Sequence, residues 1–135
     1  MSCVVRITKS YRRFCEDKLF CGDFECYNTI INFDMVEAFL QEGATVILCG
    51  SRPESAEKAV QALKAQDPDA KVEGISPELS DYKSVKAAFD AVAEKYGRID
   101  ILVNNAGMSD ATPFADYTPE QFRKVMDLNV NGMFN

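Results

Sequence analysis

From residue 34 onward, apolar positions follow two alternating patterns along the chain. The continuous apolar run Thr45–Cys49 predicts a strand buried on both faces. Two further strands are predicted, a weaker one over Lys71–Ile75 and the strongest over Ile99–Val103. Around these runs, apolar residues recur three and four positions apart, which predicts helices over 34–41, 53–65, 81–96 and from 118 onward. Strands alternating with helices of this length are typical of βαβ units, so the sequence predicts an α/β fold with a parallel sheet and flanking helices.

Capping signals mark several expected helix ends. Asp34 followed by Glu37, and Thr118 followed by Gln121, have the spacing of a capping box. We therefore expect one helix to begin at Asp34 and another to begin after Thr118. Two glycines fit the turns that follow helices: Gly43 and Gly97.

The first 33 residues differ from the rest because no strand or helix period is sustained in them. Their β-branched content makes Cys3–Thr8 and Asn28–Phe33 candidate strands. We expect two parts, an atypical segment over 1–33 and an α/β unit over 34–135. Basic residues are in excess over the first eighteen positions, which suits an exposed tail or, alternatively, a cleaved transit segment.

Composition excludes several classes of protein. The 135 residues suit one domain, and the net charge of −6 argues against a nucleic-acid partner, which needs clustered positive charge. No apolar run approaches the roughly 18 residues of a membrane span. Five cysteines without CxxC spacing, and no histidine, make a metal site unexpected. The odd cysteine count favours reduced thiols and a cytoplasmic location.

The most informative stretch is Ile99–Gly107, in which an apolar run leads directly into Asn-Asn-Ala-Gly. In an open α/β sheet, ligands bind outside the carboxyl ends of the strands. Small residues at such a position let a nucleotide approach the backbone closely. The alternative interpretation is an ordinary turn rich in asparagine and glycine.

From about Met35 to Asn135 the chain resembles the short-chain dehydrogenase/reductase family. The residues that carry the resemblance lie in four stretches: Ala38–Cys49, Glu78–Asp81, Tyr96–Gly107 and Asp127–Gly132. Within the family the chain is most similar to 3-oxoacyl-carrier-protein reductases and bile-acid 3-hydroxysteroid dehydrogenases. The resemblance implies a partial Rossmann domain that binds NAD(P), a small-molecule hydroxyl or ketone substrate, and a homo-oligomer.

The resemblance assigns cofactor-facing roles to residues at three strand ends. Asn105, Ala106 and Gly107 would face the cofactor. Glu78 stands where the family usually has an aspartate near the adenine amino group, and Leu79 would lie against the adenine ring. Glu78 could instead be an ordinary polar residue before a helix.

Cofactor choice depends on the residues after Thr45–Cys49. Ser51 and Arg52 occur there, and no acid does. An acid would accept from the ribose hydroxyl of NAD, whereas an arginine can pair with the 2′-phosphate of NADP. The sequence therefore favours NADP, with NAD possible.

The resemblance also makes Asn129 the asparagine of the family's Asn-Ser-Tyr-Lys set, in which it supports a water of a proton relay. Asn131 and Asn135 are expected to be exposed polar positions of the same helix. The serine, tyrosine and lysine are expected to follow residue 135. Tyr82 and Lys86 satisfy Tyr-x-x-x-Lys literally, but their position on the adenine side favours a solvated helix face.

A second departure concerns the glycine-rich turn that the family places before its first helix. The corresponding window, Glu25–Asn32, contains no glycine, so diphosphate binding should be weak. We expected Thr29–Phe33 to replace the family's first strand. The sequence predicts an oxidoreductase-derived, truncated chain with little or no activity. The alternatives are a non-catalytic nucleotide-binding or interaction module and a remnant without independent function, because Phe122, Met126 and Met133 leave an uncovered apolar stripe.

Overall fold

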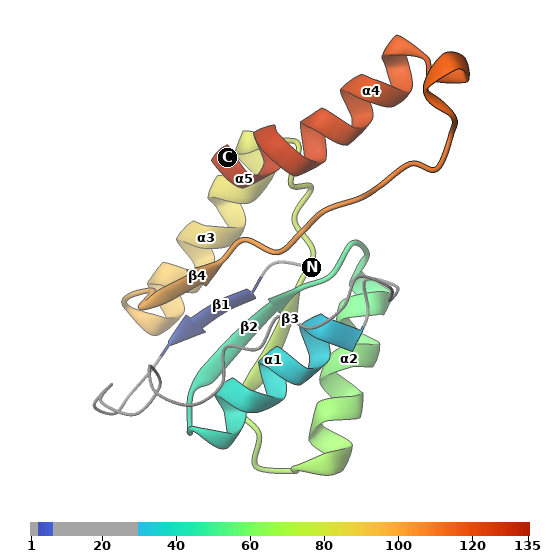
Figure 1. The fold of residues 1–135 in the computed structure, drawn as a ribbon. Coiled ribbons are helices and arrows are strands. Elements are labelled where there is room, and N and C mark those ends of the chain that lie inside the picture. Colours follow the sequence, from blue (N-terminus) through green and yellow to red (C-terminus); the bar gives the residue numbers. More distant parts are fainter. Residues whose placement is uncertain (1–2, 7–29) are drawn as a thin grey trace, which may run out of the picture.

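The computed structural model describes residues 3–6 and 30–135 of the chain. Four strands form one sheet in the order β3-β2-β1-β4 (Figure 1). Their bounds are β1 Cys3–Arg6, β2 Thr45–Cys49, β3 Val72–Ile75 and β4 Ile101–Val103. β2 is parallel to β3, and β1 is antiparallel to both β2 and β4. It follows that β2, β3 and β4 share one direction, which confirms the predicted co-directional strands.

The strand between β2 and β4 is β1, and it runs against its neighbours. Cys3 pairs with Leu48 and Val103, while Arg6 pairs with Thr45 at the start of β2. The expectation that Thr29–Phe33 fills this place is wrong, because residues 30–33 belong to a helix. A strand is confirmed over Cys3–Arg6, within the first of the two candidate stretches.

The first helix, α1, spans Ile30–Gln41, so the predicted start at Asp34 is wrong. Phe33 and Met35 pack against the same core as Val36 and Phe39. Of these residues only Phe33 precedes Asp34, and its packing on the core favours a helix that extends upstream of Asp34. The helix ends where predicted, and Gly43 in the following turn has a φ of +78° that favours glycine. The division of the chain at residues 33 and 34 stays a prediction.

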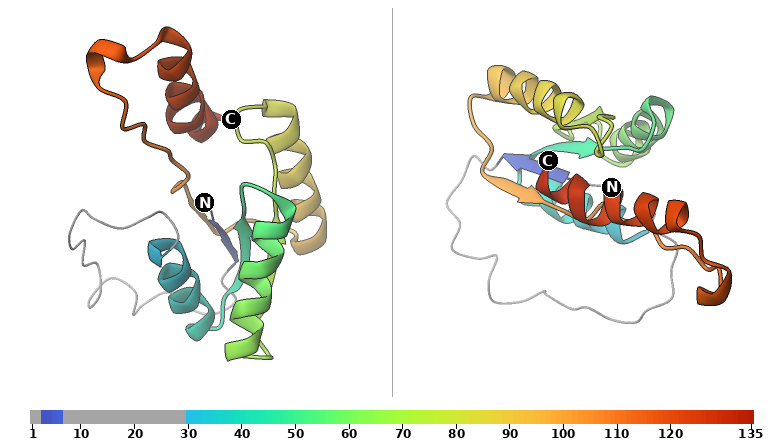
Figure 2. Two further views of the ribbon diagram at one scale, coloured as in Figure 1. Left: turned by 90° about the vertical axis from the view of Figure 1, so that its right-hand side faces the viewer. Right: turned by 90° about the horizontal axis from the view of Figure 1, so that it is seen from above.

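Helices cover both faces of the sheet. α1 and α2 (Pro53–Gln66) cover one face, and α3 (Tyr82–Tyr96) covers the other; Figure 2 shows α1 and α3 on opposite sides. Successive residues of β2 alternate between the faces, as a strand requires. Val46 and Leu48 join the core under α1 and α2, and Ile47 packs against α3. A strand buried on both faces is what its continuous apolar run predicts.

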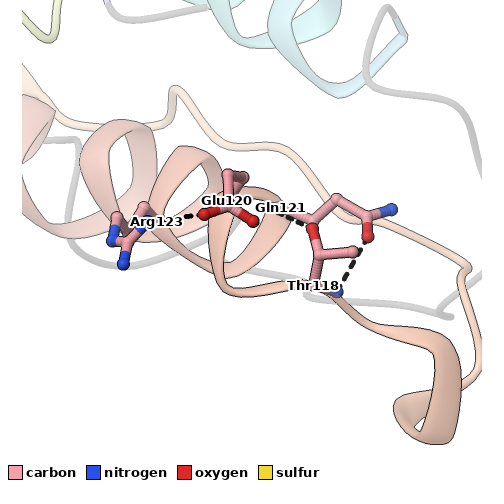
Figure 3. Close-up of polar contacts among 4 residues, drawn as sticks. All are labelled: Thr118, Glu120, Gln121 and Arg123. Atoms are coloured by element: carbon pink, nitrogen blue, oxygen red, sulfur yellow. Dashed lines mark hydrogen bonds and ion pairs between the residues drawn. The ribbon is translucent and has the colours of Figure 1, made fainter.

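The last helical region extends beyond the sheet (Figure 1). It comprises α4 (Pro119–Met126), a π-helical turn (Asp127–Asn131) and α5 (Gly132–Phe134). The predicted capping box is confirmed: Gln121 N–H donates to Thr118 Oγ1 over 3.2 Å, and Thr118 N–H donates to Gln121 Oε1 over 2.9 Å (Figure 3). The predicted apolar stripe is exposed at Phe122, Met126 and Met133.

Candidate functional site

The loops that leave β2, β3 and β4 all begin at one edge of the sheet, because these strands share a direction. The first loop carries Ser51 and Arg52, the second carries Glu78 and Leu79, and the third carries Asn105–Gly107. The fold therefore brings the three sequence-predicted groups to the carboxyl ends of co-directional strands. This edge is where open α/β sheets bind their ligands.

Close packing between α2 and the sheet fixes the start of the first loop. A Cβ at Gly50 would lie 2.8 Å from Ala56 N and 2.9 Å from Ala56 Cβ, so only glycine fits there. A Cβ at Gly74 of β3 would lie 3.0 Å from the same Ala56 Cβ. The two glycines let α2 approach both strands, which sets the direction in which the chain leaves β2.

Arg52 is the N-cap residue of α2. Its backbone is extended, with φ −148° and ψ 152°, and its side chain makes no capping hydrogen bond. Its carbonyl accepts from the backbone N–H groups of Ser55 and Ala56, at 3.1 Å each. Ser51 and Arg52 are both exposed. A cationic side chain therefore stands in solvent at the positive end of a fourteen-residue helix.

The second loop is held to the start of α3 by a set of short-range hydrogen bonds. Glu78 N–H donates to Ser84 Oγ over 2.9 Å, and Asp81 caps α3 by accepting from Lys83 N–H and Ser84 N–H. The Glu78 carboxylate accepts from Ser80 Oγ and Ser80 N–H, both on Oε1. Its other oxygen, Oε2, is used by neither bond. Glu78 is exposed and Leu79 is half-buried.

The third loop is tied to the last helical region by Asn129. Met108 N–H donates to Asn129 Oδ1 over 2.8 Å, and Asn129 Nδ2 donates to Met108 O over 2.9 Å. A Cβ at Gly107 would lie 3.4 Å from Asn129 Oδ1. Asn129 lies in the π-helical turn Asp127–Asn131, and such turns are frequent at functional sites.

Asn135 is a residue whose contact sequence reasoning missed. We expected an exposed polar helix position, but Asn135 Nδ2 donates to Leu79 O over 3.0 Å and the side chain is half-buried. Asn131 is exposed as expected and bonds Asp127 Oδ1 over 2.8 Å. Both asparagines occupy polar positions of one helical region, and the sequence carries no signal that separates them.

A cavity of about 340 Å³ lies between α3, the sheet and α5. Tyr82 and Lys86 line it, whereas Asn129 is not among its lining residues. Both side chains are exposed, and Lys86 Nζ pairs with Asp90 Oδ2 at 2.5 Å, which raises the pKa of Lys86. This is the solvated helix face that the sequence favoured. Cys49 also lines the cavity, and burial raises its thiol pKa to about 11.

Two further properties concern the described residues only. Over residues 3–6 and 30–135, no histidine, cysteine, aspartate or glutamate side chains gather in a group that could hold a metal ion. Within the same part of the chain, no helix has the length and apolar character needed to span a bilayer.

Comparison with known proteins agrees with this geometry. A 3alpha-hydroxysteroid dehydrogenase from Mediterraneibacter gnavus is 48% identical over 105 residues, covering 78% of this chain and 42% of that protein. A 3-oxoacyl-[acyl-carrier-protein] reductase from Thermotoga maritima is 35% identical over 97 residues, covering 72% of this chain and 39% of that protein. The crystal structure of a short chain dehydrogenase from Bacillus anthracis superposes with a TM-score of 0.72 at 25% identity, covering 79% of this chain and 44% of that one.

The fold and the position of the site define an α/β domain of the Rossmann type. The family model for short chain dehydrogenases matches residues 30–135, and the chain belongs to this family. The predicted resemblance is therefore confirmed, and the family binds NAD(P). The chain spans about two fifths of the length of the relatives it matches.

The described residues fit the adenosine part of such a cofactor better than its diphosphate. Leu79 offers an apolar side chain, Glu78 a carboxylate and Arg52 a cation, which suits adenine and a phosphorylated ribose. Within residues 3–6 and 30–135, no glycine-rich turn comes directly before α1, where it could hold a diphosphate. The glycine-free window Glu25–Asn32 lies partly outside the described residues. β1 ends at Arg6, which pairs with Thr45 at the start of β2. The end of β1 is therefore on the side of the sheet opposite to the three loops.

Proposed function

We propose that this chain is the adenosine-binding portion of a NAD(P)-dependent oxidoreductase that interconverts a hydroxyl and a ketone. By itself it binds an adenosine nucleotide and turns over little or no substrate. The observation that carries the proposal is the meeting of three loops at the carboxyl ends of β2, β3 and β4. In the complete proteins, the substrate is a small hydroxyl or ketone compound and the assembly is a homo-oligomer.

The proposal gives each loop a separate task. Glu78 accepts from the adenine amino group through its carboxylate, and Leu79 packs against the adenine ring. Asn105, Ala106 and Gly107 let the cofactor approach the end of β4. The exposure of Asn105 and Gly107 in the turn after β4 supports the last of these assignments.

Ser51 and Arg52 make NADP the preferred cofactor, with NAD as the alternative. No acid occurs between Cys49 and Arg52, so a ribose hydroxyl has no carboxylate acceptor from this loop. The Arg52 side chain is exposed at the N-terminus of α2, where the helix dipole also favours an anion. A 2′-phosphate would therefore be bound more strongly than a hydroxyl.

Asn129 remains the proposed member of the catalytic set. Both functional groups of its side-chain amide bond the Met108 backbone, so the side chain acts by holding the loop after β4 in place. Tyr82 and Lys86 line the cavity that Leu79 also lines, whereas Asn129 does not line it, and Lys86 is paired with Asp90. We therefore expect no measurable oxidation of NADPH with ketones, and a rate that disappears in Tyr82→Phe would overturn this.

Calorimetric titration with adenosine 2′,5′-bisphosphate and with 5′-AMP tests the binding proposal. We expect saturable binding of the bisphosphate with a Kd below about 1 mM, corresponding to about −4 kcal/mol. Arg52→Ala should weaken the bisphosphate about tenfold, or about 1.4 kcal/mol, and leave 5′-AMP unchanged. Arg123→Ala is the matched control, because Arg123 is also exposed but pairs with Glu120 on α4. Equal affinity for the two nucleotides would reject the NADP assignment.

A second candidate function is an interaction module. It is favoured by Phe122 and Met133, which expose 56% and 58% of their surfaces on the last helical region. Absence of any nucleotide binding, together with stable self-association, would favour this candidate over the first.

A further inference from the structure

We propose that Asn135 is a positioning residue for the adenine pocket and holds Leu79 at its place in the site. This inference rests on the proposed function, because that proposal places Leu79 against the adenine ring. It adds one residue from the far end of the chain to a pocket that would otherwise consist of strand-end loops.

Two independent contacts meet at Leu79. Asn135 Nδ2 donates to Leu79 O over 3.0 Å, across 56 residues of sequence. A Cβ at Gly132 would lie 3.4 Å from Leu79 O and 3.5 Å from Leu79 Cβ, at ordinary van der Waals distance, so the helix packs against the loop at this glycine. One residue of the loop is therefore held by a hydrogen bond and by close packing from the same helical region.

The same helical region also holds the loop after β4. Asn129 bonds Met108 through both ends of its amide, and Gly132 and Asn135 follow three and six residues later. Asn129 lies within the π-helical turn, and Gly132 N–H donates to Asp127 O to close that turn. A π-helical turn uses one residue more than an α-helical turn, which rotates the following residues about the helix axis. The region can thereby reach two loops at once.

The remaining bonds of the loop explain why a contact at Leu79 matters. Glu78 and Asp81 on either side are held by Ser84 and by the N-terminus of α3. Those bonds fix the two ends of a short turn, whereas Asn135 holds a carbonyl within it. Loss of the Asn135 bond should therefore change the position of Leu79 more than the position of Asp81.

Asn135→Ala tests the hydrogen bond, and Asn131→Ala is the matched control from the same helix. We expect Asn135→Ala to speed hydrogen exchange at the Ser80 and Asp81 amides and to weaken adenosine 2′,5′-bisphosphate about fivefold, or about 1 kcal/mol. Nicotinamide mononucleotide, which lacks adenine, should be unaffected. Asn135→Gln, which keeps the donor, should recover part of the affinity, whereas the near-isosteric Asn135→Asp should not.

Gly132→Ala separates positioning from general stability. Gly132 has helical backbone angles, φ −62° and ψ −31°, and alanine is the better helix former. We expect the variant to raise Tm and to leave the bisphosphate affinity unchanged, because the added Cβ would lie at ordinary van der Waals distance from Leu79. Equal weakening of the bisphosphate by Gly132→Ala and Asn135→Ala would mean that any change in this helix lowers the affinity, and would overturn the specific role of the Asn135 bond.

The outcomes of the two tests separate this inference from the proposed function. If wild type binds no adenosine nucleotide, the proposed function fails and the adenine role of Leu79 fails with it, while hydrogen exchange still reports whether Asn135 holds the loop. If wild type binds but Asn135→Ala matches Asn131→Ala in both exchange and affinity, the positioning inference is overturned and the proposed function stands.

Discussion

Asn129 and Met108 exchange two hydrogen bonds across 21 residues of sequence: the Met108 N–H donates to the side-chain oxygen, and the side-chain nitrogen donates to the Met108 carbonyl. The amide of one asparagine thus satisfies both backbone groups of one residue, which is the pairing that a neighbouring strand would supply. It orders the chain beyond Gly107 without any secondary structure there, and it connects the proposed cofactor loop to the π-helical turn.

Asn129→Ala should lower the free energy of unfolding by about 2 kcal/mol, because it leaves a partly buried N–H and C=O of Met108 without partners. Urea denaturation followed by circular dichroism measures this. Asn131→Ala, which removes only an exposed bond to Asp127, should cost less than about 0.5 kcal/mol. Equal losses in the two variants would contradict the importance of the Met108 pairing.

Asn129→Asp gives the same contact a pH dependence. The new carboxylate can accept from Met108 N–H but would face the Met108 carbonyl with a second acceptor, so the charged form is disfavoured and its folded-state pKa rises above the unfolded value of about 3.9. The sign follows from this: the variant is most stable, relative to wild type, below the unfolded pKa, and loses stability as pH rises through the folded pKa. The urea midpoint of the variant should therefore fall further below that of wild type as the pH is raised from 3 to 7.

Gly50→Ala should destabilise the fold by about 1–3 kcal/mol. The added Cβ would lie 2.8 Å from a backbone atom, Ala56 N, which cannot turn away as a side chain could. The same change should weaken adenosine 2′,5′-bisphosphate, because it displaces the loop that carries Ser51 and Arg52. Gly43→Ala is the control: it has open space around it and carries only the strain of a positive φ, so its affinity for the bisphosphate should equal that of wild type.

Much of this architecture could be predicted from local patterns. The continuous apolar run of β2 predicted a strand buried on both faces, and the Thr118–Gln121 spacing predicted a capping box that forms as expected. Asp34 and Glu37 have an equivalent spacing, yet the helix begins at Ile30. Residues three apart also face each other inside a helix, so the spacing alone does not locate a helix start. The packing of Phe33, which precedes Asp34, favours an earlier start.

Two features could not be predicted because they depend on contacts distant in sequence. The composition of Cys3–Arg6 indicated a strand, but nothing in a four-residue strand states whether it runs with or against its neighbours. Asn135 has the local appearance of any polar helix residue, and its partner Leu79 lies 56 positions away. Among the predicted cofactor residues, the sequence placed Glu78 before a helix but gave no sign that Ser80 and Ser84 would fix it.

Cys49 should react slowly with iodoacetamide, because burial raises its pKa to about 11 from an ordinary value of 9.0 and the thiolate is the nucleophile. Mass spectrometry of the Cys49 peptide measures the alkylation rate. We expect this rate to rise about tenfold per pH unit between pH 8 and pH 10. In urea the rate should level off near pH 9. A native rate that levels off at that same pH would contradict the burial of this thiol.

The raised pKa of Cys49 also makes the stability of the fold depend on pH. The contribution of the neutral thiol is fully present below pH 9 and is lost as pH rises toward 11. The variant Cys49→Ala should not show this loss.

The exposed apolar residues of the last helical region should make the chain self-associate. Phe122, Val130 and Met133 expose 56%, 45% and 58% of their surfaces, and burial of such apolar surface against a second molecule is favourable. Sedimentation velocity should show concentration-dependent association of wild type, and the double variant Phe122→Ser, Met133→Ser should shift it toward monomer. Asn131→Ser, an exposed change on the same helical region, should leave the distribution as in wild type. If the double variant associates as strongly as wild type while remaining folded, another surface is responsible and the interaction-module candidate loses its support.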